Sequence, residues 1–257
     1  GTRPIRHDGY DKVTGRAIYG GDLTLPGLIW GVCVRSPHAH ANIKSIDTSA
    51  AEAMDGVLAV ITGADMPEAL DKLVDLGEGN VNFKWASNKL MADDKVVYRG
   101  HPVAAVAAVD RYTAEEAARK VVVEYEVLKA VTNVTDALAP DAPIVLPDLV
   151  GDDLGEDVTN TNMAEHVRHE FGDVEGAMAS AAHTIEREYN MQMVHQGYIE
   201  PHNATAVWDE EDRIKIWTST QGAFAARTQI AGILQVDVSK VKVTPLEIGG
   251  GFGGKIP

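Results

Sequence analysis

The sequence predicts an α+β fold, because apolar runs of strand length and helical patterns follow one another without a regular strand–helix–strand repeat. Short apolar runs bounded by Gly and Pro, such as Gly56–Thr62, indicate strands. Segments with helical spacing, such as Gly222–Leu234, separate them at irregular intervals. The chain has 257 residues, of which 45% are hydrophobic and 24% are charged, and this composition is typical of a globular protein with a hydrophobic core.

Four strands are predicted before residue 110. Leu28–Arg35 is an apolar run of strand length, and Ile43–Asp47 is expected to pair with it after an intervening turn. Gly56–Thr62 and Val103–Val109 are apolar almost throughout, which predicts strands that are buried on both faces.

A helix and a further strand are expected next. Thr113 offers an N-cap and Glu116 stands three residues later, so a capping box is expected to open the helix TAEEAARK. In Val121–Val127 the apolar residues alternate with Glu124 and Glu126, and this period of two predicts a strand with one face in water.

Residues 148–165 are acidic, interrupted by Gly and almost free of bulky apolar side chains, which is typical of a linker. The sequence therefore predicts one domain over residues 1–147 and a second over residues 166–257. The second is expected to contain a helix, a long strand, a hairpin, a second helix and a final strand: Asp173–Ala182, His183–Val194, Ala204–Trp208 with Ile214–Thr218, Gly222–Leu234 and Val241–Ile248.

Charge and hydropathy argue against several classes of function. The chain has 38 acidic and 23 basic residues, and its formal net charge of −15 disfavours binding to nucleic acid or to an anionic membrane surface. The apolar stretch Val103–Val109 is far shorter than the roughly 20 residues of a membrane span, and no signal peptide is visible, so we expect a cytoplasmic protein. Cys33 stands alone, so neither a disulfide nor an iron–sulfur cluster is expected within this chain, and its apolar strand predicts a buried side chain.

Gly249–Lys255, with the sequence GGGFGGK, is the strongest sign of a ligand site. Glycines allow backbone N–H groups to approach an anionic or oxygen-rich ligand, because no Cβ atom intervenes. The spacing matches part of a dinucleotide fingerprint and part of a phosphate loop, but no helix follows in this sequence, and Ile256 stands where a phosphate loop has Ser or Thr. A nicotinamide or ATP site is therefore not expected, and Phe252 argues against the alternative of a solvated glycine tail.

Several motifs, in order, resemble the large, molybdenum-binding subunit of the xanthine dehydrogenase/aldehyde oxidase family over nearly the whole chain. The matching segments are an entry motif, two segments of an a/b hammerhead domain, the lead-in to the first molybdopterin-binding domain, and the start of a helix with the glycine loop: Asp8–Tyr19, Arg35–Ala41, Val123–Leu128, Gln196–His202, and Ser219–Gln221 with Gly249–Lys255. The resemblance implies a hammerhead domain over residues 1–147, then the linker, then the first part of a molybdopterin-binding domain over residues 166–257.

The implied chemistry belongs to a cofactor, and no metal ligand is expected from this chain. Members of the family hold molybdenum on the dithiolene of a molybdopterin, and the cytosine dinucleotide form is expected here. The resemblance implies an oxidoreductase that hydroxylates an aldehyde, an aromatic heterocycle or a related carbon centre with oxygen from water. Electrons are expected to pass to iron–sulfur clusters and FAD on partner chains. The implied partners are the remainder of the molybdenum subunit, an iron–sulfur subunit, a flavin subunit and a small-molecule substrate.

The resemblance also implies which residues serve the cofactor. Gln221 matches the family glutamine whose amide hydrogen-bonds an oxygen ligand of molybdenum, so it is expected to act in catalysis and in cofactor binding. A neutral amide donor suits such an oxygen. The loop expected to lie against the metal and the pterin consists of Gly250, Gly251, Phe252 and Gly253.

Two departures from the family limit the prediction. The general base of the family is a glutamate near the C-terminal end of a longer subunit, and that region is not in this sequence. Ile256 replaces the substrate-binding glutamate of purine-oxidising members, which disfavours purines and leaves aldehydes, aromatic N-heterocycles and acyl-CoA substrates open. The alternative hypothesis is a scaffold or interaction domain that keeps the fold and binds no molybdenum; the absent base favours it, whereas Gln221 and the glycine loop argue against it.

The other polar residues of interest are expected to be structural. Glu200, beside a proline, is expected to be a buried anchor for backbone amides, and Lys255 is expected to be either a phosphate partner or a solvated lysine. The histidines for which a structural role is favoured over metal binding or catalysis are His38, His40, His195 and His202.

Overall fold

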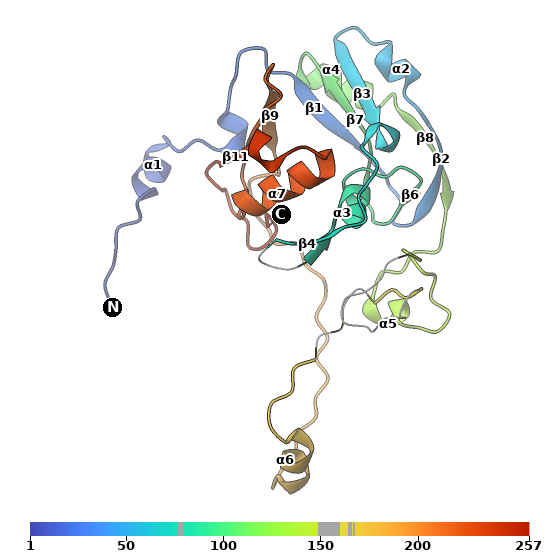
Figure 1. Cartoon of the computed structure of the whole chain (residues 1–257), viewed down its shortest axis with the longest axis vertical. Helices are drawn as coiled ribbons and strands as arrows, with labels where there is room; N and C mark the ends of the chain where they lie inside the picture. Colours follow the sequence, from blue (N-terminus) through green and yellow to red (C-terminus); the bar gives the residue numbers. More distant parts are fainter. Residues whose placement is uncertain (77–79, 149–159, 164–165, 167, 257) are drawn as a thin grey trace. The chain divides into compact units, whose positions relative to one another are not determined.

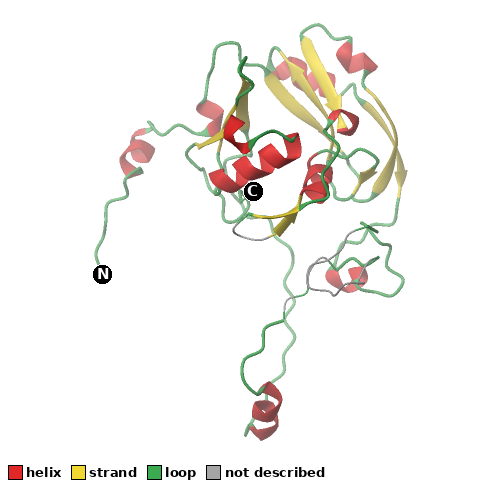
Figure 2. Cartoon of the chain, in the orientation of Figure 1, coloured by secondary structure: helices red, strands yellow, loops and turns green. Residues whose placement is uncertain are grey.

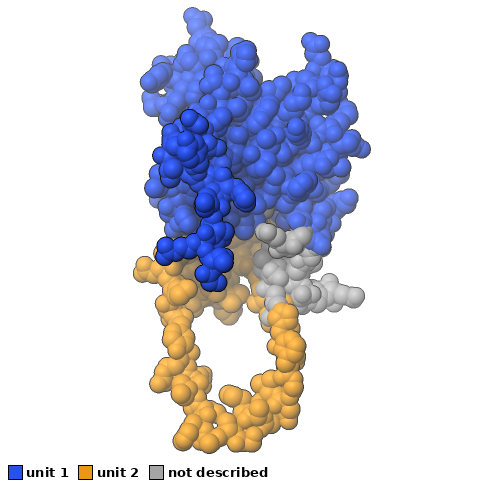
Figure 3. All heavy atoms as spheres, turned by 90° about the vertical axis from the view of Figure 1, so that its left-hand side faces the viewer, with its two compact units in different colours: residues 1–126, 195–257 blue, residues 127–194 orange. Residues whose placement is uncertain are grey.

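The computed structural model describes residues 1–76, 80–148, 160–163, 166 and 168–256. The chain forms two compact units, one of Gly1–Glu126 with His195–Pro257 (unit 1) and one of Val127–Val194 (unit 2), which Figure 3 shows in separate colours. Most of the predicted linker, residues 148–165, lies outside the described residues. In the described part of the chain, no helix is both long and apolar enough to cross a bilayer.

The first half of unit 1 builds two three-stranded sheets (Figure 1). In the first, the central strand β7 pairs antiparallel with a neighbour on each side, in the order β1-β7-β3. The second has the order β6-β2-β8. The bounds are Trp30–Arg35 (β1), Ala41–Asp47 (β2), Val57–Thr62 (β3), Lys95–Val96 (β6), Pro102–Ala108 (β7) and Val122–Val127 (β8). Val34, Ile46 and Val123 contact buried residues of two core clusters, so one apolar interior serves both sheets.

Strand pairing differs from the predicted hairpin of Leu28–Arg35 with Ile43–Asp47. β1 pairs with β7, whereas β2 pairs with β6 in the other sheet. The turn after β1 explains the difference. The backbone N–H of Ser36 donates to the carbonyl of His101 at 2.9 Å, and Gly100 donates to Ser36 at 2.9 Å, so the chain leaves β1 beside the segment that leads into β7.

Burial on both faces, predicted for Gly56–Thr62 and Val103–Val109, is found in β7 and is wrong for β3. β7 lies between two strands and most of its side chains are buried. β3 is an edge strand, and it leaves Leu58 and Ile61 exposed. Composition does not reveal how many neighbours cover a strand, and this is why the two apolar runs differ.

The helix predicted after residue 110 is present as α4, Arg111–Ala118, but its cap is a different residue. Asp110 is the N-cap, and its carboxylate accepts the backbone N–H and the hydroxyl of Thr113, each at 2.9 Å. Thr113 is therefore the donor of the capping interaction. The alternation predicted for the next strand is confirmed in β8, where Val123 and Tyr125 are half-buried and Glu124 is exposed.

The second half of unit 1 forms a third sheet, in the order β9-β10-β11. β9 (Ala204–Trp208) and β10 (Ile214–Thr218) are the predicted antiparallel hairpin. β10 then pairs in parallel with β11 (Val241–Pro245), and α7 (Ala223–Leu234) is the crossover between them. The α+β fold thus contains a parallel strand–helix–strand unit, whose buried core consists of Ile214, Ile216, Ala231 and Val241.

The two halves of unit 1 meet where α3 (Phe83–Leu90) packs on α7. Phe83 is buried, and its ring lies where a Cβ atom on Gly232 would be. Gln235, at the end of α7, donates from Nε2 to the carbonyl of Glu68 at 2.5 Å. Further short elements of unit 1 are α1 (Gly9–Thr14), η1 (Gly20–Asp22), α2 (Ser49–Glu52), η2 (Gly63–Asp65), β4 (Leu73–Asp75), β5 (Asn80–Asn82) and η3 (Val238–Lys240).

Unit 2 contains α5 (Val134–Ala137) and α6 (Val174–Ser180). α6 confirms the helix predicted over Asp173–Ala182, with Asp173 accepting the backbone N–H of Gly176 at 2.8 Å as the N-cap. The strand predicted over His183–Val194 is wrong, since the segment has no strand pairing and is drawn as a loop (Figure 2). An alternating sequence forms a strand only where another strand supplies hydrogen bonds.

Candidate functional site

Gln221 and the glycine loop meet at one edge of the third sheet. β10 and β11 run parallel with Thr218 opposite Pro245, so the segments that follow them leave at the same edge. The backbone N–H of Gln221 donates to the carbonyl of Lys255 at 2.9 Å, which joins the start of the crossover to the end of the loop. Ligands of strand–helix–strand units bind outside the carboxyl ends of the strands, where this junction lies.

The side-chain oxygen of Gln221 points into the loop. Its Oε1 atom accepts the backbone N–H of Gly253 at 3.1 Å and that of Lys255 at 3.3 Å. An amide NH₂ group cannot accept these bonds, so the orientation of the carboxamide is fixed by the loop. The Nε2 group consequently points away from these two donors, and its N–H groups can donate to another acceptor.

Glycine is required in the loop for two different reasons. A Cβ atom on Gly251 would lie 2.5 Å from Oε1 of Gln221, and one on Gly249 would lie 2.5 Å from Cβ of Glu200, so these positions have no room for a side chain. Gly250 and Gly253 have φ values of +98° and +86°, a conformation that L side chains rarely adopt. Beyond Gly253 there is open space, so the loop presents one side freely.

Phe252, at the tip of the loop, is 73% exposed and has a φ of +52°. A non-glycine residue in this conformation is uncommon and marks a backbone that its surroundings hold in place. A bulky apolar side chain with so much exposed surface is expected to lie against a ligand or another segment of protein.

Glu200 is the predicted anchor for backbone amides. One carboxylate oxygen, Oε2, accepts the backbone N–H of Gly249 at 2.8 Å, and Oε1 accepts that of Gly20 at 3.4 Å. Burial by itself raises the pKa of this carboxyl. Hydrogen bonds from Lys255 and from the two glycine amides outweigh burial, so the pKa of Glu200 lies below its usual value.

Lys255 is not the solvated lysine of the sequence prediction. Its side chain is only 1% exposed, and its Nζ atom lies 2.6 Å from Oε2 of Glu200. Nζ also donates to the hydroxyl of Ser219 at 3.2 Å and lies 5.2 Å from the centre of the Tyr198 ring. The other prediction, a partner for a cofactor phosphate, is not supported, because the ammonium is already paired with a carboxylate inside the protein. The partners are 55 residues apart, and no local signal links them.

Sequence comparison assigns both halves of the chain. Residues 14–129 match the a/b hammerhead domain of aldehyde oxidase and xanthine dehydrogenase. Residues 155–257 match the molybdopterin cofactor-binding domain. The chain belongs to the xanthine dehydrogenase and aldehyde oxidase family.

Two named relatives align with almost the whole length of this chain. The carbon monoxide dehydrogenase large chain of Afipia carboxidovorans is 35% identical over 94% of this chain and 30% of its own length. The nicotinate dehydrogenase large molybdopterin subunit of Eubacterium barkeri is 30% identical over 100% of this chain and 55% of its own length. The chain thus spans between about a third and about half of these relatives.

Solved structures of molybdenum enzymes have the same fold as this chain. The reconstituted CO dehydrogenase from Oligotropha carboxidovorans aligns with a TM-score of 0.81 and 34% identity, covering 100% of this chain and 32% of that one. Quinoline 2-oxidoreductase from Pseudomonas putida 86 aligns with a TM-score of 0.78 and 30% identity, covering 99% and 31%. The predicted α+β class, with a hammerhead domain followed by a molybdopterin-binding domain, is confirmed.

Three of the four histidines for which a structural role was predicted pack against aromatic rings. His38 packs edge-on against Tyr125, and both His195 and His202 pack against Tyr198. Burial lowers the pKa of His202, and the nearby charge of Lys255 lowers it further. His40 is buried. Among the described residues, no group of three or more His, Cys, Asp or Glu side chains could hold a metal ion.

Cys33 corrects a prediction, because it is exposed and not buried. β1 is an edge strand of its sheet, and Gly31, Cys33 and Arg35 lie on its exposed side. This side of the hammerhead domain lines a groove of about 620 Å³ together with residues of β9.

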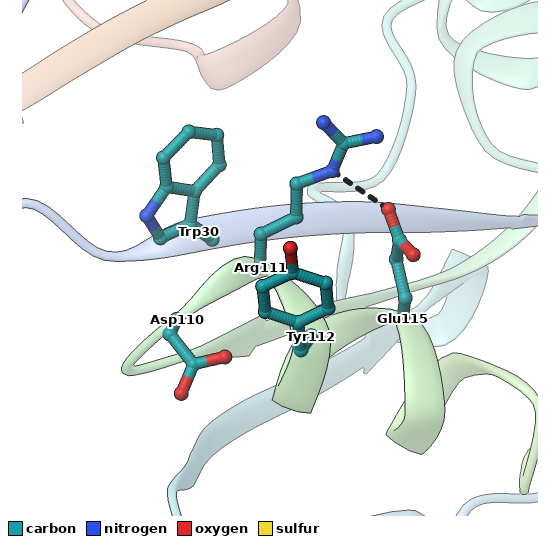
Figure 4. A pocket seen from close by; sticks show the side chains of 5 residues that line it. All are labelled: Trp30, Asp110, Arg111, Tyr112 and Glu115. Carbon is teal, nitrogen blue, oxygen red and sulfur yellow. Dashed lines mark hydrogen bonds and ion pairs between the residues drawn. The ribbon is translucent and has the colours of Figure 1, made fainter.

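A second hollow, of about 510 Å³, lies at the start of α4 (Figure 4). Its three charged side chains bond to one another or to the helix, since Arg111 pairs with Glu115 at 2.7 Å and Asp110 caps α4. Its lining shares no residue with the glycine loop or with Gln221. We assign no chemistry to it.

Sequence reasoning missed two contributors to the site. Gly20, in η1, donates its backbone N–H to Glu200, and Tyr198 lies beside the ammonium of Lys255. Tyr198 stands in the motif that precedes Glu200 and could have been considered on that ground. Gly20 carries no local signal, because its role depends on a partner 180 residues away.

Proposed function

We propose that this chain forms the cofactor-facing part of a molybdenum hydroxylase, an oxidoreductase that hydroxylates an aldehyde, an aromatic N-heterocycle or a related carbon centre with oxygen from water. The observation that carries the proposal is the orientation of the Gln221 carboxamide, whose oxygen is bound by the loop and whose NH₂ group is turned away from it. Nicotinate and quinoline, named for two of the relatives, are aromatic N-heterocycles, and so are the xanthine and hypoxanthine named for others, so the relatives support this broad substrate class.

The residues fit a molybdopterin that carries molybdenum, and we propose the cytosine dinucleotide form. The loop has no side chain at Gly251 and open space beside Gly253, and its backbone N–H groups are neutral donors, which suits the close approach of an oxygen-rich group. When bound, the cofactor supplies the two-electron oxidation and the oxygen transfer. The proposed contacts are Gln221 Nε2 to an oxygen ligand of the metal, and Gly250, Gly251, Phe252 and Gly253 against the metal and the pterin.

Gln221 acts in this proposal as a donor that is set before any ligand arrives. A prearranged neutral donor stabilises charge that develops on an oxygen without reorganising during the reaction, and removal of one such donor costs about 10²–10³ in kcat. The loop contributes by holding the carboxamide and by excluding side chains from the approach. The chain itself provides no general base in this proposal.

We propose that the domains are a hammerhead over residues 1–147, a linker over residues 148–165 and the first part of the molybdopterin-binding domain over residues 166–257. The proposed partners are the remainder of the molybdenum subunit, an iron–sulfur subunit and a flavin subunit with FAD. Support comes from the relatives named as a large chain and a large subunit, of which this chain spans only a part. We propose a cytoplasmic location for the assembly.

The second candidate function is a scaffold or interaction domain that keeps the fold without molybdenum. The arrangement of Gln221 and the glycines weighs against it, because an interaction domain has no need of a carboxamide held by two backbone donors.

Native mass spectrometry, with molybdenum analysis of the same fraction purified from the natural source, tests the proposal. An enzyme component travels with larger partners and near-stoichiometric molybdenum, and substrate screening with aldehydes and N-heterocycles follows. A scaffold binds partners without molybdenum, and this outcome would overturn the proposal. In the molybdenum-loaded assembly, Gln221→Ala is expected to lower kcat about 10²-fold. Gln229→Ala, in the α7 helix that follows Gln221, is the matched control and is expected to leave kcat unchanged.

A further inference from the structure

We infer that Glu200 is a positioning residue whose carboxylate, with Lys255 as its counter-ion, clamps the two ends of the glycine loop and thereby sets the orientation of Gln221. The inference rests on the proposed function for its purpose, but the clamp itself consists only of residues of this chain.

Both ends of the loop are bound to one atom. Oε2 of Glu200 accepts the backbone N–H of Gly249 at 2.8 Å and the ammonium of Lys255 at 2.6 Å. Gly249 is the first residue of the segment and Lys255 the last, so the five residues between them are closed into a ring through a side chain. The carbonyl of Gly249 also accepts the backbone N–H of Glu200 at 3.3 Å, which fixes the first end twice.

The same carboxylate holds the N-terminal segment against the loop. Its Oε1 atom accepts the backbone N–H of Gly20 at 3.4 Å. Beside it, Tyr19 and Glu247 form a parallel bridge, and the backbone N–H of Glu247 donates to the carbonyl of Ile18 at 3.2 Å. Glu200 therefore joins three segments that are far apart in the sequence, at the point where β11 passes into the loop.

The pair is buried, with side-chain exposures of 11% for Glu200 and 1% for Lys255. A buried ion pair contributes little net stability, but removing one partner leaves an uncompensated charge. In some proteins such buried ionic groups select one arrangement of the chain over others. Here the arrangement it selects is the conformation of the glycines, which have the largest intrinsic freedom of any residue.

The clamp reaches Gln221 through the loop. Oε1 of Gln221 accepts the backbone N–H groups of Gly253 and Lys255, and the second of these belongs to the residue that Glu200 holds. If the end of the loop moves, Gln221 loses the donors that orient its carboxamide. Glu200 bonds to the two ends of the loop and to Gly20, so it acts by positioning.

The test uses the whole 257-residue chain without cofactor, so that it does not depend on the proposed reaction. Glu200→Gln and Lys255→Met each remove one charge at nearly constant volume, and the double variant removes both and leaves no unpaired buried charge. Glu126→Gln is the matched control, because Glu126 forms an exposed ion pair with Lys44. Hydrogen–deuterium exchange is followed in peptides that cover residues 249–255 and, for comparison, the α7 residues 229–234.

The expected result is at least a tenfold faster exchange of the loop amides in each single variant and in the double variant, with α7 unchanged. The side-chain NH₂ signals of Gln221 in ¹⁵N NMR spectra, assigned from Gln221→Ala, are expected to shift or broaden in the same variants. Lys255→Arg keeps the charge and is expected to restore a large part of the protection, whereas Glu126→Gln changes neither readout.

Unchanged loop exchange in Glu200→Gln and in the double variant would overturn the inference. An equal rise in exchange in the loop and in α7 would also overturn it, because that result indicates general loss of stability and not control of the loop. If the loop responds as expected but the natural protein contains no molybdenum, the clamp stands and the proposed function fails, so the two failures are distinguishable.

Discussion

A Cβ atom on Gly232 of α7 would overlap the ring of Phe83 of α3, at its Cε2 and Cζ atoms. This contact joins the hammerhead half of unit 1 to the helix whose first residues lie beside the candidate site. Gly232→Ala is therefore expected to destabilise the chain by about 1–3 kcal/mol through overpacking. It does so although Ala favours a helix over Gly by about 0.5–1 kcal/mol. Urea denaturation of the whole chain measures the change.

Two further variants separate overpacking from a general helix effect. Gly21→Ala places a Cβ in open space without a positive φ and is expected to have little effect on the free energy of unfolding. Phe83→Leu combined with Gly232→Ala is expected to be less destabilised than the sum of the single variants, because the smaller side chain makes room. Simple additivity would contradict the contact.

Gly251→Ala is expected to disturb the candidate site without unfolding the chain. The new Cβ would lie 2.5 Å from Oε1 of Gln221, so the carboxamide or the loop has to move. We expect reduced retention of molybdopterin, measured as the molybdenum content of the purified assembly. In a Gln221→Ala background the same substitution is expected to cause a smaller further loss, since the obstructing oxygen is gone. An equal loss of molybdenum in both backgrounds would show that the effect of Gly251→Ala does not depend on the Gln221 side chain.

His101 is expected to make stability depend on pH. It is buried, its Nδ1 accepts the backbone N–H of Val97, and its Nε2 lies 2.6 Å from the carbonyl of Asn88. Burial lowers its pKa, and the bond to Asn88 only partly opposes this effect. Below the ordinary pKa of about 6.5, His101 is protonated in the unfolded chain, whereas in the folded chain it stays neutral to a lower pH. The free energy of unfolding therefore falls as the pH falls.

Urea titrations at pH 7.5 and 5.5 measure this effect. We expect the decrease to be smaller in His101→Gln than in the natural chain, whatever stability the variant has at pH 7.5. His7→Gln, at an exposed histidine, is the control and keeps the full decrease. An identical slope in all three proteins would show that His101 is not protected from protonation.

Asp209 organises the turn between β9 and β10. Its carboxylate accepts the backbone N–H of Arg213 at 2.9 Å, and it lies near the charged groups of Arg213 and Lys215. The bond from the Arg213 backbone is the largest cause, and it lowers the pKa of Asp209 to about 2. The ionised carboxylate of Asp209 therefore stabilises the hairpin fully above the ordinary Asp pKa of about 3.9, and this stabilisation is lost as the pH falls toward 2. A carboxyl ¹³C NMR titration is expected to show that value for Asp209, and a midpoint at the ordinary value of about 3.9 would contradict the prediction.

Cys33 provides a direct check of the edge strand. Because it is exposed, a thiol reagent is expected to modify the folded chain without denaturant, to one equivalent. Modification of the unfolded chain in urea is the control and is expected to give the same yield. Protection of the thiol in the folded chain would indicate that β1 is covered and that the sequence prediction of a buried Cys33 is right.

Local patterns predicted the parts of the fold that depend on neighbouring residues. The hairpin of β9 and β10, the helices α4, α6 and α7, and the alternation in β8 all follow from spacing within one segment. The glycine loop could be predicted as a candidate ligand site for the same reason, since Gly250 and Gly253 have backbone conformations that L side chains rarely adopt. The boundaries of these elements differ from the predictions by a few residues, and the cap of α4 moved to Asp110 because its carboxylate reaches the first turn.

Partners that are far apart in the sequence were decided by the tertiary structure. The pairing of β1 with β7, the missing strand at residues 183–194, the exposure of Cys33 and the buried pair of Glu200 with Lys255 all depend on which segments come to lie together. A residue's own neighbours determine its preferred backbone, whereas burial and ion pairing depend on what covers it. By itself the sequence thus determined the loop and the chemical nature of Gln221. The folded chain decided that a carboxylate 49 residues before the loop holds its first residue, because only packing brings the two together.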